Sequence, residues 1–113
     1  MRTLPMLICV FGAGLLLAGG PVRAQSPEAG NADRGHAFAV RTCAGCHAIE
    51  RGQPRTTKAR PATFETIANT PGMTDMALSV WLRSPHPTMP NFILEPEQIR
   101  DVTAYIGTLR DPK

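Results

Sequence analysis

The sequence has few aromatic residues and few cysteines. Aromatic side chains make up 5% of its 113 residues, which is little for a small core made of side chains alone. Three cysteines are present, and Cys9 lies in an apolar stretch at the N-terminus. If that stretch is removed, only Cys43 and Cys46 remain, and no cysteine is left for a separate disulfide. The stability of so small a domain must then come from another source.

Several other patterns are missing. We find no convincing strand pattern, no internal repeat and no low-complexity segment. Neither a nucleophile–base pair nor a carboxylate dyad is apparent, so we assign no catalytic residue and do not expect an enzyme. Of the 12 basic residues, Arg2 and Arg23 precede residue 25, which leaves 10 against 9 acidic residues. So balanced a charge gives no reason to expect a nucleic-acid partner.

Residues 1–24 have the pattern of a signal peptide. A short positive start at residues 1–3 precedes an apolar stretch at residues 4–18, and Val22-Arg23-Ala24 forms a small-residue cleavage signal. The apolar stretch is short for a membrane span, which needs about 20 residues, although an uncleaved tether stays open. We therefore predict export to the periplasm, cleavage after residue 24, and one domain at residues 25–113 with an ordered core at about 30–110.

The chemistry of the chain centres on Cys43-Ala44-Gly45-Cys46-His47. In a helical turn, positions i, i+3 and i+4 share one face. Cys43, Cys46 and His47 occupy those positions, so two sulfurs and one imidazole would point the same way. A haem requires this combination, because its two vinyl groups bond to the sulfurs and its iron binds the imidazole. The stretch therefore predicts one covalently attached haem c, with His47 as an iron ligand.

Three other interpretations of the cysteine pair are weaker. A thioredoxin-like dithiol belongs to a βαβ setting that this sequence does not show. A zinc site needs four ligands, and the distant His36 or His86 would have to complete it. A disulfide between Cys43 and Cys46 would close a strained small ring and would leave His47 without a role.

Local capping signals and apolar patterns predict three or four helices and an all-α fold. Their expected ranges are about 32–46, about 64–68, about 75–84 and about 96–109, after the N-caps Asn31, Thr63 and Thr74 and with Pro96 opening the last helix. The last helix has the clearest apolar stripe, formed by Ile99, Val102, Ile106 and Leu109.

A second unusual stretch, residues 84–90, contains three prolines and Met89. The prolines fix the backbone and lower the entropy lost on ordering, so this loop can present a thioether to an iron. The chemistry of a haem iron bound by one histidine depends on what occupies its other face. Met89 is the favoured ligand there, while His86 in the same loop and an open site remain alternatives. His36 belongs to the helix before His47 and cannot reach the opposite face.

The ordered set Gly35, Cys43-x-x-Cys46-His47, Pro61, Met89-Pro90 and Tyr105 resembles a small class I cytochrome c over residues 30–110. The resemblance implies a small cytochrome c fold of three to four helices around one haem, with the first and last helices crossing near Gly35 and Tyr105. It also implies that the carbonyl of Pro61 accepts the Nδ1–H of His47. By the same analogy, Trp81 donates its indole N–H to a haem propionate.

The resemblance further implies a periplasmic one-electron carrier whose iron is bound by His47 and Met89, with redox proteins as donors and acceptors. Two alternatives remain open. One is a dedicated cytochrome subunit of an oxidoreductase complex, and the other is a haem protein in which a gaseous ligand or peroxide displaces Met89. The basic segment at residues 48–60 is expected to be a surface loop that could dock an acidic partner. No stable membrane insertion is expected once the signal peptide is removed.

Overall fold

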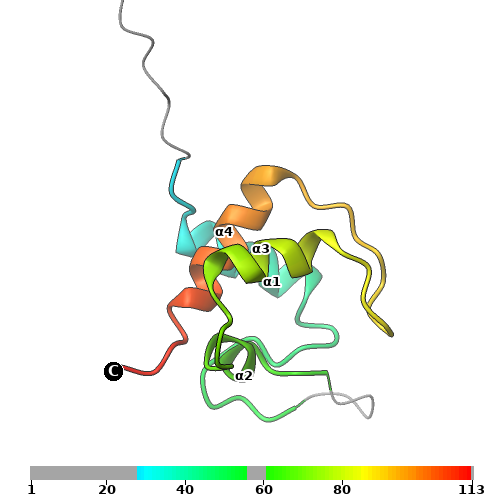
Figure 1. The fold of residues 1–113 in the computed structure, drawn as a ribbon. Helices are drawn as coiled ribbons and strands as arrows, with labels where there is room; N and C mark the ends of the chain where they lie inside the picture. Colours follow the sequence, from blue (N-terminus) through cyan, green and yellow to red (C-terminus); the bar gives the residue numbers. More distant parts are fainter. Residues whose placement is uncertain (1–27, 56–60, 113) are drawn as a thin grey trace, which may run out of the picture.

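A computed structural model describes residues 28–55 and 61–112, and these residues form four helices (Figure 1). The helices are α1 at Ala32–Thr42, α2 at Phe64–Ala68, α3 at Asp75–Arg83 and α4 at Pro96–Gly107. The described residues contain no strand, which confirms the predicted all-α fold. None of the described helices is long and apolar enough to span a membrane. The predicted signal peptide lies outside the described residues.

Local hydrogen bonds begin the helices as the sequence predicts. Three N-caps, Asn31, Thr63 and Thr74, use their side-chain oxygens to accept the backbone N–H three residues further on, at 2.9, 3.0 and 3.1 Å. At α4, Pro96 takes the first helical position, where its missing N–H costs nothing. The side-chain oxygen of Gln98 accepts the backbone N–H of Glu95 at 2.9 Å, as in a capping box. Each helix start is therefore set by residues within one turn.

Helices α1 and α4 cross at backbone contact. A Cβ added to Gly35 would lie 2.9 Å from the Cβ of Tyr105, and it would approach the carbonyl oxygen of Asp101 more closely than real Cβ atoms ever do. Gly30, just before α1, is pressed against the carbonyl of Arg100 in the same way. Glycine alone has no Cβ to obstruct such an approach. The predicted crossing of the first and last helices near Gly35 and Tyr105 is confirmed.

A buried carboxylate fastens the same crossing. Asp101 on α4 is 5% exposed, and it accepts hydrogen bonds from the backbone N–H of Asn31 at 2.7 Å and from two nitrogens of Arg34 at 2.7 and 3.0 Å. The guanidinium also lies 3.1 Å from Glu97. The hydrogen bond from Arg34 holds the pKa of Asp101 below its ordinary value, although burial acts in the opposite direction. A buried charge is tolerated when it is paired in this way.

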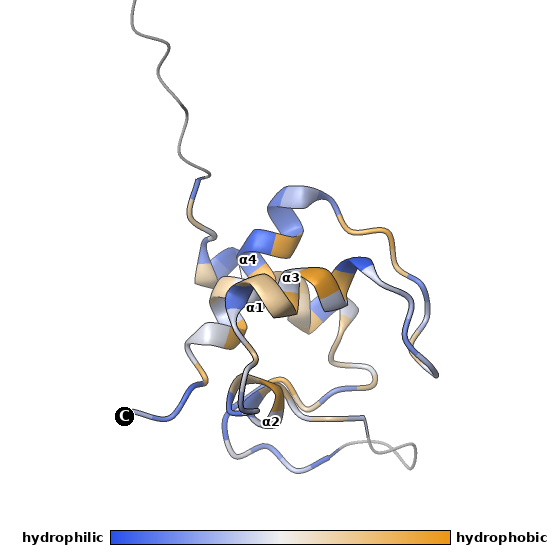
Figure 2. Ribbon diagram, viewed as in Figure 1, coloured by the Kyte–Doolittle hydropathy of each residue, from blue (hydrophilic) through white to orange (hydrophobic). Residues whose placement is uncertain are grey.

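The hydrophobic core lies between α1, α3 and α4 and extends to α2. The predicted apolar stripe is buried, since Ile99, Val102 and Ile106 of α4 and Leu109 are between 1% and 6% exposed. Leu109 lies beyond the end of α4 at Gly107, so the expected helix to about residue 109 is two residues too long. Ala39 of α1, Phe64 of α2 and Leu78 of α3 pack in the same core, and Tyr105 adds a ring from α4 itself. Figure 1 shows α2 at one end of the domain and a long loop running from α3 to the start of α4. Figure 2 shows a further apolar stretch on the part of that loop that leads into α4.

Candidate functional site

Cys43, Cys46 and His47 share one hydrogen-bonded turn that directly follows α1. The carbonyl of Cys43 accepts the backbone N–H of Cys46 at 3.1 Å and that of His47 at 2.9 Å. The helix itself ends one residue before Cys43, so the prediction of a helix through Cys46 is wrong. The reason is that Cys43 and Ala44 both donate to the carbonyl of Ala39, at 2.8 and 2.9 Å, which interrupts the helical register. The turn nevertheless keeps two sulfurs and an imidazole within five residues.

The imidazole of His47 is held in one tautomer by a backbone carbonyl. Its Nδ1 lies 2.7 Å from the carbonyl oxygen of Ala62, and the proton sits on Nδ1 because a carbonyl only accepts. Nε2 of the neutral ring then carries the lone pair that a metal needs. The predicted acceptor, Pro61, is wrong by one residue, because the carbonyl that faces Nδ1 belongs to Ala62, directly before the N-cap Thr63. The ring also packs against the buried Phe64, with 5.6 Å between the centroids.

A contact between Pro61 and the haem stays a prediction. The Pro61 side chain is half-buried at the start of the segment that leads into α2. Its neighbour supplies the carbonyl, so any role of Pro61 itself lies in stiffening this segment or in packing.

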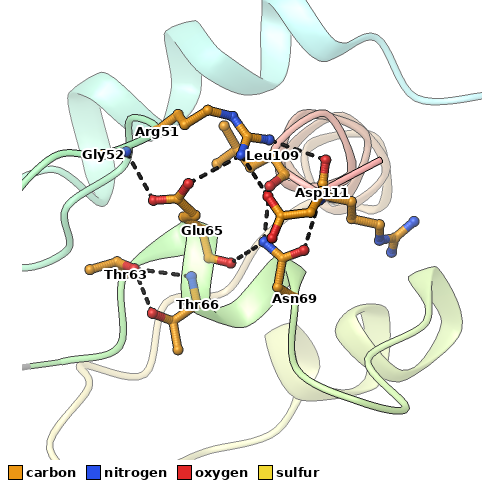
Figure 3. A network of polar contacts seen from close by, with 9 residues as sticks. Arg51, Gly52, Thr63, Glu65, Thr66, Asn69, Leu109 and Asp111 are labelled. Carbon is orange, nitrogen blue, oxygen red and sulfur yellow. Dashed lines mark hydrogen bonds and ion pairs between the residues drawn. The ribbon is translucent and has the colours of Figure 1, made fainter. Parts of the chain in front are cut away.

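A network of polar contacts fixes the segment that supplies the carbonyl (Figure 3). Arg51 pairs with Glu65 of α2 at 3.1 Å and with Asp111 near the C-terminus at 2.9 Å. The second carboxylate oxygen of Glu65 accepts the backbone N–H of Gly52 at 2.9 Å. Asn69, at the end of α2, accepts the backbone N–H of Asp111 at 2.8 Å. Helix α2 is thereby tied both to the loop after the histidine and to the C-terminus.

A second polar cluster ties the residues after His47 to α1 and α4. The hydroxyl of Tyr105 lies 2.9 Å from the carbonyl of Ile49 and 3.1 Å from Oε2 of Glu50. Nε2 of His36 lies 2.6 Å from Oε1 of the same carboxylate. Burial and the adjacent Glu50 raise the pKa of Tyr105 to about 12, so its hydroxyl remains a donor at neutral pH. The imidazole of His36 is engaged by a carboxylate.

The environment of the cysteines bears on two of the weaker interpretations. Cys43 is half-buried and Cys46 is exposed. Burial raises the pKa of the Cys43 thiol to about 11, whereas a redox-active dithiol depends on a lowered thiol pKa. Among residues 28–55 and 61–112, no three Cys, His, Asp or Glu side chains lie close enough together to hold a metal ion. The described residues therefore support neither a dithiol catalyst nor a zinc site.

The loop between α3 and α4 brings His86 and Met89 together. Nε2 of His86 lies 2.7 Å from Sδ of Met89, and Nδ1 lies 2.9 Å from the carbonyl of Ser84. Trp81, near the end of α3, packs edge-on against the imidazole with 5.6 Å between the centroids. Thr88 has a φ of 69°, in the left-handed region that a β-branched residue rarely adopts. A hydrogen bond from Trp81 to a haem propionate stays a prediction.

Large apolar side chains are exposed near the end of α3 and within this loop. Trp81 is 52% exposed, Phe92 44% and Ile93 91%. Trp81 contacts His86 of this loop, so an apolar cofactor bound beside the loop would cover exposed apolar surface. A haem is a large apolar plate, and together with the two thiols and the lone pair of His47 these side chains fit its chemistry. We conclude that the residues present can hold a covalently attached haem.

The sequence did not reveal two residues that shape the site, Ala62 and Glu65. Thr63 was a usable signal for the first, because an N-cap fixes the direction of the chain just before it. No local signal could have found the second. Its partner Arg51 is 14 residues away along the chain, and Arg51 in turn reaches Asp111 across 60 residues.

Known proteins resemble this chain over nearly the whole described region. Residues 32–110 match the family described as Cytochrome c, and this range includes every residue predicted to bind the haem. The chain is also similar to cytochrome c-552 of Bradyrhizobium diazoefficiens, with 39% identity over 101 residues, which cover 88% of this chain and 93% of that protein. No solved structure matches the chain significantly.

Proposed function

Because this chain belongs to the cytochrome c family, we propose that it is a periplasmic electron carrier whose single haem c is attached to Cys43 and Cys46 and bound through its iron by His47 and Met89. Membership of the family means one covalent haem c, redox proteins as partners, and electron transfer rather than enzymatic turnover. When bound, the haem supplies an iron that exchanges one electron. The main structural support for the proposal is the hydrogen bond from His47 to the carbonyl of Ala62, which orients the imidazole as a metal ligand.

The task of His47 is to offer one nitrogen in a fixed direction. Its Nδ1–H donates to the Ala62 carbonyl at 2.7 Å, so the lone pair of the neutral ring lies on Nε2 and the ring cannot rotate without losing that bond. Such a partner also raises the basicity of the ligating nitrogen. The polar network around Glu65 keeps the carbonyl in place. Little has to rearrange at this side when an electron arrives or leaves.

The task of Met89 is to close the opposite face with a neutral, soft ligand. A thioether favours the ferrous state, so we expect a reduction potential on the high side for a haem. The prolines around Met89 limit the conformations of the loop. Exposed apolar side chains beside it, Trp81 and Phe92 among them, are suited to covering the porphyrin and keeping water away from it.

Export and partner docking are the remaining parts of the proposal. The pattern of residues 1–24 favours transport to the periplasm, where haem c is attached. Fewer basic side chains of the expected docking loop are available to a partner than the sequence suggests, because Arg51 already pairs with Glu65 and Asp111. Arg55 is exposed, while Lys58 and Arg60 lie outside the described residues. A rate of electron transfer that is indifferent to salt would argue against electrostatic docking altogether.

An optical spectrum of the exported protein in both oxidation states tests the proposal. The oxidised protein should show a thioether–iron charge-transfer band, and Met89→Ala should lose it. Met76→Ala is the matched control, because Met76 is 74% exposed on α3, and it should keep the band. The haem should also stay attached after denaturation, through the two cysteines.

Addition of carbon monoxide to the reduced protein separates a carrier from a gas-binding protein. A closed site predicts an unchanged spectrum, since Met89 occupies the position that the gas would need. A band that survives in Met89→Ala would refute the ligand assignment. Haem that washes out under denaturing conditions would refute the attachment.

A further inference from the structure

His86 and Met89 present two different donor atoms at one place. Nε2 of His86 lies 2.7 Å from Sδ of Met89, and both side chains are half-buried. The loop therefore places an imidazole nitrogen and a thioether sulfur, which are both ligands of haem iron in proteins, side by side.

The other ring nitrogen of His86 faces a backbone carbonyl. Nδ1 lies 2.9 Å from the carbonyl oxygen of Ser84, and a carbonyl only accepts, so Nδ1 carries the proton. In that tautomer the lone pair lies on Nε2, the nitrogen next to the sulfur. A hydrogen bond of the same kind holds His47, whose Nδ1 donates to the Ala62 carbonyl at 2.7 Å. Both imidazoles are therefore prepared as metal ligands through Nε2.

The surroundings hold the His86 ring at this place independently of Met89. Trp81 packs edge-on against the ring, at an interplanar angle of 78°. Pro85 and Pro87 flank His86 in the chain and restrict its backbone. A nitrogen kept this close to the thioether has an effective concentration of about millimolar or more at any metal the thioether binds.

The backbone between the two side chains can also change. Thr88 has a φ of 69°, a left-handed conformation that is unfavourable for a residue other than glycine. A return of Thr88 to ordinary backbone angles would rotate Met89 relative to His86. The exchange of one donor atom for the other is thus a local movement within residues 86–89, and α3 and α4 need not separate.

We propose that His86 can replace Met89 as an axial ligand. Nε2 of His86 binds the haem iron whenever the thioether of Met89 is not bound to it. The inference rests on the proposed function, in which Met89 is the ordinary ligand. Ligation by two imidazoles keeps the iron closed to small external ligands. It also gives the carrier a lower reduction potential, because the thioether that favours ferrous iron is gone.

Spectra of the ferric haem protein test the proposal, by optical absorption and electron paramagnetic resonance. Met89→Ala should be low-spin, with the signature of two nitrogen ligands and without the thioether band. Met89→Ala/His86→Asn should be high-spin. The control Met89→Ala/His36→Asn should match Met89→Ala, because His36 is bound to Glu50 on another part of the surface. Added imidazole should bind the His86 double variant about tenfold or more tighter than Met89→Ala, since no ligand has to be displaced.

Two results would overturn the proposal: a high-spin Met89→Ala protein, or a double variant without His86 that stays low-spin. The first result decides the question even if the double variant folds poorly. Recovery of a low-spin spectrum on addition of imidazole, with unchanged helical circular dichroism, shows that the site of the double variant is intact. Failure of the proposed function gives a different result, because wild-type protein would then lack the thioether band or the covalent haem.

Discussion

The substitution Gly35→Ala tests the crossing of α1 and α4, on which the shape of the haem protein depends. The added Cβ would lie 2.9 Å from the Cβ of Tyr105 and closer still to the carbonyl oxygen of Asp101. Both obstacles belong to the backbone of α4 or are attached directly to it, so neither can turn aside as a long side chain would. The two helices must move apart by roughly 1 Å or more to restore ordinary contacts of about 3.5–4 Å.

Two opposing terms set the expected magnitude. Replacing a helical glycine with alanine contributes up to about 1 kcal/mol in favour of the folded state. Overpacking against a backbone that cannot yield costs about 3 kcal/mol. We therefore expect Gly35→Ala to lower the free energy of unfolding by about 2 kcal/mol, which corresponds to a fall in Tm of roughly 10 °C for a domain of this size.

Gly107→Ala is the matched control. This glycine ends α4, and its added Cβ would meet only Nη1 of Arg110, at an ordinary 3.8 Å. The same chemical change should therefore leave stability unchanged or raise it by up to about 1 kcal/mol. The assay is guanidinium unfolding of the haem protein followed by helical circular dichroism, with all proteins at one salt concentration and one pH.

The comparison of the two variants can refute the reasoning. If Gly35→Ala were as stable as Gly107→Ala, α1 and α4 would not meet by backbone contact at this point. An equal loss in both variants would instead point to a general effect of alanine on these helices. A lower yield of Gly35→Ala alone would be the cellular counterpart of the expected instability.

Three further predictions concern buried or capping groups. Thr103→Val should raise the free energy of unfolding by about 1 kcal/mol, measured by denaturant titration, because the hydroxyl of Thr103 is buried with no hydrogen-bond partner in the described part of the chain. Asp101→Asn should lower Tm at neutral pH and should make the fall in Tm between neutral and acidic pH smaller. The reason is that the hydrogen bond from Arg34 holds the folded-state pKa of Asp101 below its ordinary value. That stabilisation is present above about pH 4 and is lost as the pH falls through the lower folded-state pKa. Thr63→Ala and Thr74→Ala should each lower the free energy of unfolding by about 1 kcal/mol, because each removes an N-cap. Only Thr63→Ala should shift the reduction potential, since Thr63 directly follows Ala62, whose carbonyl holds His47.

The sequence alone determined the features that depend on residues close together in the chain. The attachment turn is five consecutive residues, so its chemistry can be recognised without any knowledge of the fold. N-caps such as Asn31 and Thr74 act on an amide three residues away, and Ile99, Val102 and Ile106 repeat within one helix. These local interactions are nearly independent of the rest of the molecule.

Only the tertiary structure decided which distant groups meet. The Nδ1–H of His47 donates to the carbonyl of Ala62 rather than to that of Pro61. Which carbonyl faces the ring depends on how the chain enters α2. Asp101 could be recognised as the buried partner of Arg34 only once α1 and α4 were placed against each other. Even the end of α1 followed from the hydrogen bonds of the turn and not from helix propensity. Sequence patterns report short-range physics, whereas the directions of carbonyls and the pairing of buried charges depend on the packing of the whole chain.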